Sequence, residues 1–275
     1  MQEPNPDPDS ETNSPSLTVE QAIANLTHED LGLRYYAAWW LGKFQIKTPA
    51  ASEALLVALE DEADRTELGG YPLRRNAARA LGKIGDQQAV PSLIKCLDCS
   101  DFYVREAAAQ ALGMLGDPVA IPALMQLLSG GLEAAVQVAG MPHLAQPYEA
   151  VMEGLGLLQA KEAIPLIQPF LAHFVDRVQY SANRAMYQLT KESIYGEKLV
   201  QALAGKDIQL RRVALSDLGA IGYLPAADAI AQSAAENSFK LMALKGLLEH
   251  QISLEQPESL NDDAIKVMNL MDNLL

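Results

Sequence analysis

The residues best suited to bind a ligand lie close together in the segment 34–44. This segment holds both tryptophans of the chain, Trp39 and Trp40, and two of its nine tyrosines, Tyr35 and Tyr36. Large aromatic side chains outside a core are costly to leave bare and are favoured as anchors for ligands and partners. The segment is therefore the first candidate for a binding site.

The segment is one of three related copies, and the other two lack the aromatic residues. The frame Arg-x-x-Ala-Ala-x-x-Leu-Gly covers residues 34–42 and returns at 74–82 and 105–113. Tyr35 and Trp39 are four residues apart, so they are neighbours on one helix face. Polar residues stand at the matching places of the other copies, which are Arg75 and Glu106 for Tyr35, and Arg79 and Gln110 for Trp39. We therefore expect Tyr35 and Trp39 to face solvent or a groove and to contact a ligand or a partner.

The other two aromatic residues of the segment have different expected roles. Trp40 matches alanines in both sister copies, which predicts that it packs inward together with Ala37, Leu41 and Phe44. Tyr36 matches an asparagine and an alanine, so either a buried or an exposed position fits it.

Four arginines accompany these aromatic residues, although the chain as a whole is acidic. Arg34 belongs to the first copy, and Arg74, Arg75 and Arg79 belong to the second. Guanidinium groups beside aromatic rings suit a flat, conjugated ligand that carries carboxylates. An alternative is that these arginines pair with the acidic run at 60–62. The candidate ligand or partner site comprises Arg34, Tyr35, Tyr36, Trp39, Arg74, Arg75 and Arg79.

Residues for acid–base, nucleophilic or metal chemistry show no specific arrangement. The four histidines are scattered, and a single His-Glu pair at 28–29 cannot build a two-metal site. Cys96 lies in an apolar helical run, and no second pair of ligands joins it and Cys99. We expect no metal, and the sequence leaves any catalytic residue unknown.

Composition limits the class of protein. The chain has 275 residues, of which 49% are hydrophobic, mostly alanine and leucine, and only 6% are aromatic. Alanine and leucine favour closely packed helices. The formal net charge of −14 disfavours nucleic acid as a partner, because such a surface repels phosphates. No apolar run is long enough to span a membrane and no signal pattern is evident, so we expect a cytoplasmic protein.

A period near 31 residues organises the chain. The Leu-Gly pair or its equivalent recurs at this spacing from Gly82 to Gly113 and from Gly156 to Tyr187, with two helical patterns in each unit. Such a period is typical of α-solenoids. We predict an all-α, HEAT-like repeat α-solenoid, a crescent-shaped, right-handed superhelix of antiparallel helix pairs.

Two intervals between repeats are longer than this period, at 40 and 43 residues. The extra residues fall near 61–71 and 129–147, each between the first and the second helix of a unit. They therefore emerge on the same edge of the solenoid. We predict a single solenoid over residues 17–275 that includes these two long loops. The polar, proline-rich tail at 1–16 cannot bury enough surface to order, and we predict that it is disordered.

Local signals place the helix ends and the buried faces. Gly85 and Gly116 follow the helical stretches, where a left-handed residue is favoured. An arginine recurs eight residues before the glycine of the frame, and for Arg105 and Arg211 we expect it to hydrogen-bond a neighbouring repeat unit. In the second copy the apolar stripe consists of Leu73, Ala77, Ala80, Leu81 and Ile84.

Together with these repeats, the stretch Tyr-Tyr-Ala-Ala-Trp-Trp-Leu-Gly at 35–42 resembles the E/F-type phycobilin lyases. The run Arg-Ala-Leu-Gly-Lys-Ile-Gly-Asp at 79–86 and the unit Ala-Val-Pro-Ser-Leu at 89–93 add to the likeness. Many HEAT-like proteins share such repeats, so the aromatic stretch is the more specific part. The resemblance covers essentially the whole chain from Leu17 onward.

The resemblance implies a heterodimer with an F-type subunit of similar fold, in a phycobilisome-bearing photosynthetic cell. The pair would bind phycocyanobilin as substrate, with no resident cofactor, and attach its ethylidene group through a thioether to a cysteine of the phycocyanin alpha chain. The bilin rings would lie against Tyr35 and Trp39, and the propionates would pair with Arg34, Arg74 or Arg75. Catalysis would then consist of positioning the bilin for the acceptor thiol. An alternative is a non-catalytic HEAT-repeat adaptor or chaperone-like scaffold.

Overall fold

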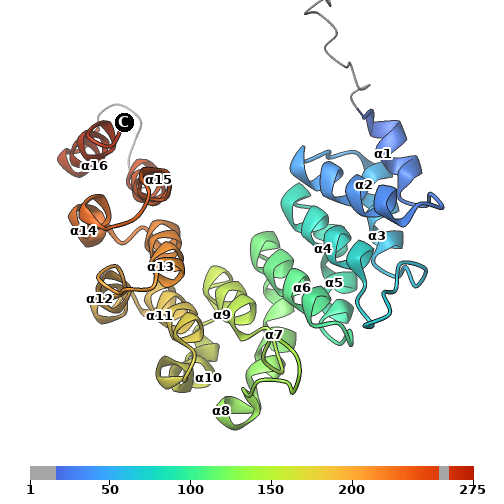
Figure 1. The fold of residues 1–275 in the computed structure, drawn as a ribbon, viewed down its shortest axis with the longest axis horizontal. Coiled ribbons are helices and arrows are strands. Elements are labelled where there is room, and N and C mark those ends of the chain that lie inside the picture. The colour runs from blue at the N-terminus through green and yellow to red at the C-terminus, as the bar shows by residue number, and fades with distance from the viewer. Residues whose placement is uncertain (1–16, 254–259) are drawn as a thin grey trace, which may run out of the picture.

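The computed structural model describes residues 17–253 and 260–275. Within these residues, regular structure is helical apart from one isolated bridge between Gln137 and Leu144. The helices form a two-layered crescent that runs from α1 at one tip to α16 at the other (Figure 1). This is the predicted all-α, HEAT-like solenoid. The predicted disorder of residues 1–16 lies outside the described residues.

The two layers follow from the alternation of helices along the chain. Each inner helix packs against the next inner helix and is backed by an outer one (Figure 1). The inner helices are α2 (Leu31–Lys43), α4 (Pro72–Ile84), α6 (Phe102–Leu115), α9 (Tyr148–Leu157), α11 (Asp176–Thr190), α13 (Ile208–Ile221) and α15 (Asn237–Ser253). The outer helices are α1 (Val19–Asn25), α3 (Pro49–Ala58), α5 (Val90–Cys96), α7 (Ile121–Leu128), α10 (Ile164–Ile167), α12 (Ser193–Ala202), α14 (Ala227–Gln232) and α16 (Asp262–Asp272).

Short helices occupy several of the connections. A four-residue helix, α8 (Gly131–Ala134), lies in the longer insert between α7 and α9. Single 3₁₀ turns lead into or extend outer helices at η1 (Gln87–Ala89), η2 (Pro118–Ala120), η3 (Lys161–Ala163), η4 (Gln168–Ala172) and η5 (Leu224–Ala226).

Sequence signals account for the helix ends. Before α1, the Thr18 side chain accepts from the Gln21 backbone and the Gln21 side chain accepts from the Thr18 backbone, which is a complete capping box. Gly85 ends α4 with φ 80°, and Gly116 ends α6 with φ 73°, both in the left-handed region. Asp86 caps the short helix that follows Gly85. The predicted ends of these helices are confirmed.

The glycine of the repeat frame sets how closely the inner helices pack. A β-carbon on Gly42 would lie 2.7 Å from the Cα atom of Ala80, and one on Gly82 would lie 2.8 Å from the Cα atom of Ala111. Backbone atoms cannot yield as a flexible side chain can, so each glycine fits where the next helix crosses. The apolar stripe predicted for the second copy is buried throughout.

The prediction that Phe44 belongs to the core is wrong. Phe44 is the C-cap of α2, and 54% of its surface is exposed. Because the helix ends at Lys43, the residue that follows leaves the buried stripe. The Phe44 ring lies 4.9 Å from the ring of Trp40, which is half-buried and packs against the core as predicted.

The first insert, between α3 and α4, is held by three carboxylates, of which Asp64 is buried and Asp61 and Asp101 are half-buried. The Asp61 side chain accepts a hydrogen bond of 2.8 Å from the Asp64 backbone, and the Asp64 side chain accepts one of 2.7 Å from the backbone of Leu73 in α4. The Asp101 side chain accepts one of 2.8 Å from the backbone of Tyr71. The loop therefore has a defined path along the edge of the solenoid.

The second insert, between α7 and α9, folds back on itself. The Val138 backbone donates to His143 at 3.1 Å, and the Ala145 backbone donates to Val136 at 2.9 Å. The buried side chain of His173, just before α11, ties the insert to the next repeat through a contact of 3.0 Å between its Nε2 atom and the carbonyl of Ala135.

Candidate functional groove

The aromatic residues of α2 divide as the comparison of copies predicts. Tyr35 and Trp39 are 41% and 39% exposed, whereas Trp40 is half-buried against the core. Tyr36 is also exposed, and its ring lies 5.4 Å from the ring of Trp39. The inner face of the first helix pair therefore presents a cluster of three aromatic side chains.

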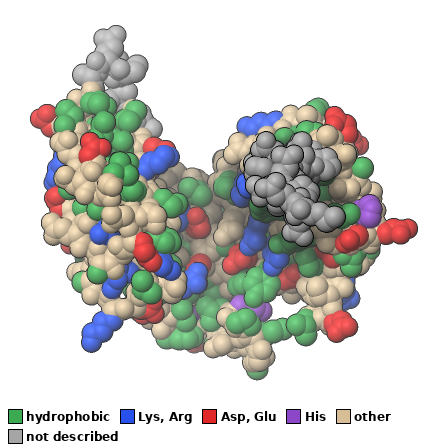
Figure 2. All heavy atoms as spheres, turned by 45° about the horizontal axis from the view of Figure 1, so that its top comes forward, with side chains coloured by type: hydrophobic (Ala, Val, Ile, Leu, Met, Phe, Trp, Pro, Cys, Tyr) green, Lys and Arg blue, Asp and Glu red, His purple; other side chains and the backbone are tan. Residues whose placement is uncertain are grey.

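A groove of about 630 Å³ crosses four inner helices and contains the two aromatic residues singled out by the sequence. The hollow between the arms of the crescent carries hydrophobic side chains and charges of both signs on its walls (Figure 2). The side chains that give the groove its chemistry are Tyr35 and Trp39 from α2, Arg79 and Lys83 from α4, Gln110 and Met114 from α6, and Glu153 and Leu157 from α9.

Arg79 is the predicted arginine that the structure brings to this groove. Its side chain is 41% exposed, and its Nη2 atom lies 3.5 Å from the carboxylate of Glu106. The separation is longer than a good hydrogen bond, so the guanidinium retains donors for a ligand. Burial raises the pKa of the Glu106 carboxyl, against the lowering effect of Arg79.

Arg34 and Arg74 are engaged with the first insert instead. The Nη1 atom of Arg34 lies 3.0 Å from the carboxylate of Asp61. Arg74 donates to the backbone oxygen of Asp61 at 2.7 Å and pairs with Glu62. Of the two alternatives that the sequence leaves open, these contacts favour pairing with the acidic insert over contact with a groove ligand.

Two further arginines of the repeat frame, Arg105 and Arg211, also bind connecting segments of the solenoid. Arg105 donates to the carbonyls of Cys99 and Ala145 at 2.7 and 2.9 Å, so it joins the preceding loop to the second insert. Arg211 donates to the carbonyl of Leu203 at 3.1 Å and also to that of Ala234 in the next unit. The prediction that Arg105 and Arg211 hydrogen-bond a neighbouring repeat unit is confirmed.

Arg75 lies away from the groove, toward the edge with the inserts. Its guanidinium carbon is 5.9 Å from the ring centroid of Tyr103. Its Nε atom is buried without a hydrogen-bond partner among the described residues. The seven predicted residues thus fall into three places, because Tyr35, Trp39 and Arg79 line the groove, Tyr36 flanks it, and the other three arginines lie elsewhere.

The sequence comparison misses several groove residues on α4, α6 and α9. They occupy two positions of the repeat frame, one three residues before the frame glycine and the other one residue after it. Each position recurs on successive inner helices and so forms a row along the inner layer. The first row gives Gln110 and Glu153 in addition to Trp39 and Arg79, and the second gives Lys83, Met114 and Leu157. Extending the alignment of copies through these two rows would have found them.

A buried charge network supports the far end of the groove. The Arg184 side chain on α11 lies 2.9 Å from Glu153 and 3.1 Å from Asp217 on α13. The Asp217 Oδ2 atom is buried without a partner among the described residues. Burial raises the pKa of the Asp217 carboxyl to about 6, and this outweighs the lowering effect of Arg184.

The groove is built to bind and orient a ligand. No group of three or more histidine, cysteine or acidic side chains placed to hold a metal ion occurs among the described residues. Cys96 is buried, which raises the pKa of its thiol to about 11 and keeps the thiol in its weakly nucleophilic form. Aromatic faces, two cations, one carboxylate and the side-chain amide of Gln110 are the groups that the groove offers to a ligand.

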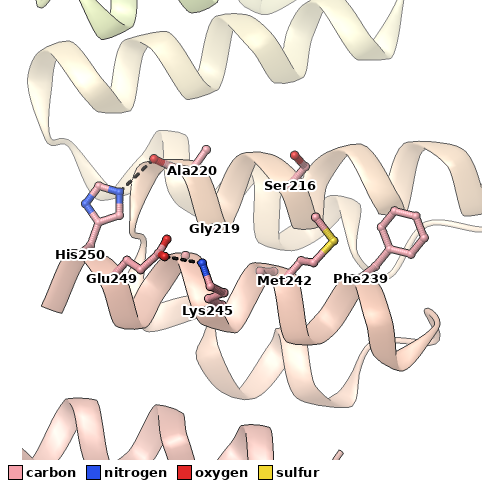
Figure 3. Close-up of a pocket in the computed structure, with 10 residues that line it drawn as sticks. Ser216, Gly219, Ala220, Phe239, Met242, Lys245, Glu249 and His250 are labelled. Carbon is pink, nitrogen blue, oxygen red and sulfur yellow. Dashed lines mark hydrogen bonds and ion pairs between the residues drawn. The ribbon is translucent and has the colours of Figure 1, made fainter. Parts of the chain in front are cut away.

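A second hollow on the inner layer, of about 500 Å³, lies between α13 and α15. It is bordered by Phe239, Met242 and an ion pair between Lys245 and Glu249, and His250 contacts the carbonyl of Ala220 at 3.0 Å (Figure 3). None of the seven predicted site residues lies there.

No helix in the part of the chain that the structure describes is long and apolar enough to cross a bilayer.

Comparisons with known protein families agree with this architecture. A family model described as HEAT repeats matches residues 71–139, and one described as PBS lyase HEAT-like repeat matches residues 33–61. The second match includes the aromatic helix α2. The fold and these two matches thus indicate a HEAT-repeat protein of the phycobilisome-lyase class.

Individual relatives narrow this class. A phycocyanobilin lyase subunit alpha from a Nostoc species is 68% identical over 264 residues, which cover 96% of each chain. The subunit alpha of a Synechocystis species is 58% identical over 267 residues, 95% of this chain and 98% of the relative. The bilin biosynthesis protein PecE of a Nostoc species is 44% identical over 265 residues, 96% of this chain and 98% of the relative.

A solved structure extends the agreement to three dimensions. It is the complex of CpcE and CpcF of phycocyanin lyase from a Nostoc species, and the matching chain is 67% identical with a TM-score of 0.89. The match covers 99% of this chain and 100% of that chain. The chain belongs to the E-type phycobilin lyase family, the family of phycocyanobilin lyase alpha subunits.

Proposed function

We propose that this chain is the alpha subunit of a heterodimeric lyase that attaches phycocyanobilin to a cysteine of the phycocyanin alpha chain. The observation that carries the proposal is that Tyr35 and Trp39 on α2 line one groove together with two cationic side chains on α4, Arg79 and Lys83. The matching solved structure is a complex with an F-type subunit, which supports an F-type partner here. The proposed setting is the cytoplasm of a phycobilisome-bearing cell.

The chemistry of the groove suits an open-chain tetrapyrrole. Its volume of about 630 Å³ is within the range of about 300–1,000 Å³ that is usual for small-molecule sites. The exposed rings of Tyr35 and Trp39 offer surfaces for stacking on the conjugated pyrroles. Arg79 and Lys83 are the groove cations that would pair with the two propionates, because Arg34 and Arg74 are occupied by the insert.

The reaction is an addition in which atoms and electrons balance. The sulfur of the acceptor cysteine bonds to the exocyclic carbon of the ethylidene group while the carbon–carbon π bond breaks. The neighbouring ring carbon takes up a proton, in exchange for the one that the thiol loses. The acceptor supplies the nucleophile, so the lyase contributes by holding the bilin in one conformation beside the incoming thiol.

The test is bilin transfer by a Tyr35→Ala, Trp39→Ala double variant. We expect the heterodimer to form normally and the yield of thioether-linked phycocyanobilin to fall at least tenfold, because both stacking surfaces are lost. A Tyr103→Ala variant, which removes an exposed aromatic side chain outside the groove, serves as the control. Unchanged transfer with an intact heterodimer would contradict the groove assignment, and loss of the heterodimer would make the aromatic residues partner anchors.

The similarity to phycocyanobilin lyase alpha subunits favours the lyase over a non-catalytic adaptor, and one observation tests the choice directly. Co-expression of this chain with an F-type subunit and phycocyanobilin should produce a complex with bilin absorbance. An adaptor would bind its protein partner without acquiring that absorbance.

A further inference from the structure

We infer that Glu153 is the residue that orients the bound tetrapyrrole, by accepting hydrogen bonds from its pyrrole N–H groups. The inference rests on the proposed function of the groove and adds a positioning role that neither the aromatic cluster nor the cations can fill. An aromatic face holds a ring plane without fixing its rotation in that plane. A carboxylate acceptor at a fixed point supplies the missing direction.

Glu153 has the right place for this role. It lies on α9 at the same position of the repeat frame as Trp39 on α2 and Arg79 on α4, and it lines the groove with them. Its side chain is 32% exposed, so the carboxylate is open to the groove and partly shielded from water. Its Oε1 atom contacts Arg184, and its Oε2 atom has no hydrogen-bond partner within the described ranges.

The carboxylate is held in place from behind. The Arg184 side chain, only 12% exposed, lies 2.9 Å from Glu153 and 3.1 Å from Asp217. Asp217 is itself 8% exposed and anchors the far side of the guanidinium. Because Arg184 is itself buried and held by Asp217, Glu153 keeps its direction before any ligand arrives, which lowers the cost of ordering it on binding.

The charges around Glu153 define an orientation for the ligand. Arg184 and Asp217 lie on the next two inner helices, α11 and α13, whereas Arg79 and Lys83 lie two inner helices away in the opposite direction, on α4. An open-chain tetrapyrrole carries its propionates and its N–H groups on different atoms of the same conjugated chain. The propionates would face α4 while the N–H groups would face α9, and the opposite arrangement would place carboxylates against Glu153.

The carboxylate also predicts a spectroscopic signature. A negative charge beside the pyrrole nitrogens favours their protonated state, because an opposite charge within a few ångströms stabilises the charged form. Protonated bilins absorb at longer wavelength than neutral ones. A change at Glu153 should therefore move the absorption band of the bound ligand, whereas loss of packing alone would only weaken binding.

The experiment compares four heterodimers reconstituted with an F-type subunit: wild type, Glu153→Gln, Glu153→Asp and Glu149→Gln. Glu149 lies one turn earlier on α9, pairs with Arg177 at 3.1 Å, and lines a different cavity at the edge of the solenoid. Free phycocyanobilin is titrated into each, and the absorption spectrum and the dissociation constant are recorded. Thermal unfolding checks that each variant is folded.

The expected result is that Glu153→Gln shifts the long-wavelength band to shorter wavelength and weakens binding about tenfold, because a charge-assisted hydrogen bond is lost. Glu149→Gln should match the wild type, and Glu153→Asp should regain much of the wild-type band because it keeps the charge. Identical spectra for Glu153→Gln and Glu149→Gln would overturn the inference while leaving the groove intact. Failure of the wild-type heterodimer to bind the bilin would instead reject the proposed function on which the inference rests.

Discussion

The guanidinium of Arg34, on the same helix as the aromatic residues, lies 3.0 Å from the carboxylate of Asp61 in the first insert. Both side chains are largely buried, with 15% and 18% of their surfaces exposed. The same arginine donates from Nε to the carbonyl of His28 in the loop before α2. Arg34 therefore joins two connections of the solenoid, and its contacts define its role as structural.

This geometry predicts opposite effects for two arginines. Arg34→Ala should lower the free energy of unfolding by about 1–3 kcal/mol, because Asp61 is left partly buried without its partner, and should leave bilin affinity nearly unchanged. Arg79→Ala removes a more exposed and longer ion pair, worth about 0–1 kcal/mol, but should weaken bilin binding several-fold. Urea unfolding and bilin titration of both variants check this, and equal loss of affinity would contradict it.

A second prediction concerns the frame glycine. Gly82→Ala should destabilise the protein by about 1–3 kcal/mol, since the added methyl group would meet the Ala111 backbone at 2.8 Å and force α4 and α6 apart. Lys83→Ala, at the exposed neighbouring position, is the matched control and should change stability by less than about 0.5 kcal/mol. Denaturant midpoints of the two variants measure the difference, and similar midpoints would argue against close packing as the reason for the glycine.

The buried side chain of His173 gives a third prediction. Its Nδ1 atom accepts from the backbone of Val175 at 3.0 Å, so Nε2 carries the proton and donates to the carbonyl of Ala135. His173→Ala leaves both backbone groups without this partner and should cost about 1–3 kcal/mol. Hydrogen exchange should accelerate in the second insert, residues 129–147, and stay unchanged in the first. The control is His28→Ala, because His28 is exposed. Unchanged hydrogen exchange in the second insert of His173→Ala would contradict the conclusion that His173 holds this insert in place.

A fourth prediction is a pH dependence of stability set by Asp217. Burial raises its pKa in the folded protein from 3.8 to about 6, so between these values the folded state binds more protons than the unfolded state. The contribution of this group to the free energy of unfolding therefore falls as pH rises through that window, by about 3 kcal/mol in total. In Asp217→Asn the fall should be absent. Unfolding free energies at pH 4, 5, 6 and 7 for both proteins check it, and parallel curves would contradict it.

The features that could be predicted from the sequence are those set by local chemistry. The capping box of Thr18 and Gln21 needs only residues within one turn, and Gly85 needs only its own backbone angle. The exposure of Trp39 followed from its polar counterparts in sister helices. The repeat reveals the buried and exposed positions because equivalent residues of successive units pack in equivalent surroundings.

The features that could not be predicted depend on the inserts. Whether Arg34 faces a groove or Asp61 is decided by the path of an irregular loop, which no period describes. Gly156 gives the position of Glu153 in the frame, but its link to Arg184 and Asp217 depends on how helices from later repeats pack, which the period does not describe. Phe44 was misplaced because the helix ends one residue before it.

The most direct test of the groove is the equilibrium affinity of the heterodimer for phycocyanobilin when Trp39 is replaced by alanine. Phe174→Ala is the control, since Phe174 is 70% exposed and stacks on His173 outside the groove. We predict that Trp39→Ala raises the dissociation constant about tenfold or more, about 1.4 kcal/mol, while Phe174→Ala leaves it unchanged. Equal affinity of the Trp39→Ala and wild-type heterodimers would contradict the assignment of this groove as the bilin site.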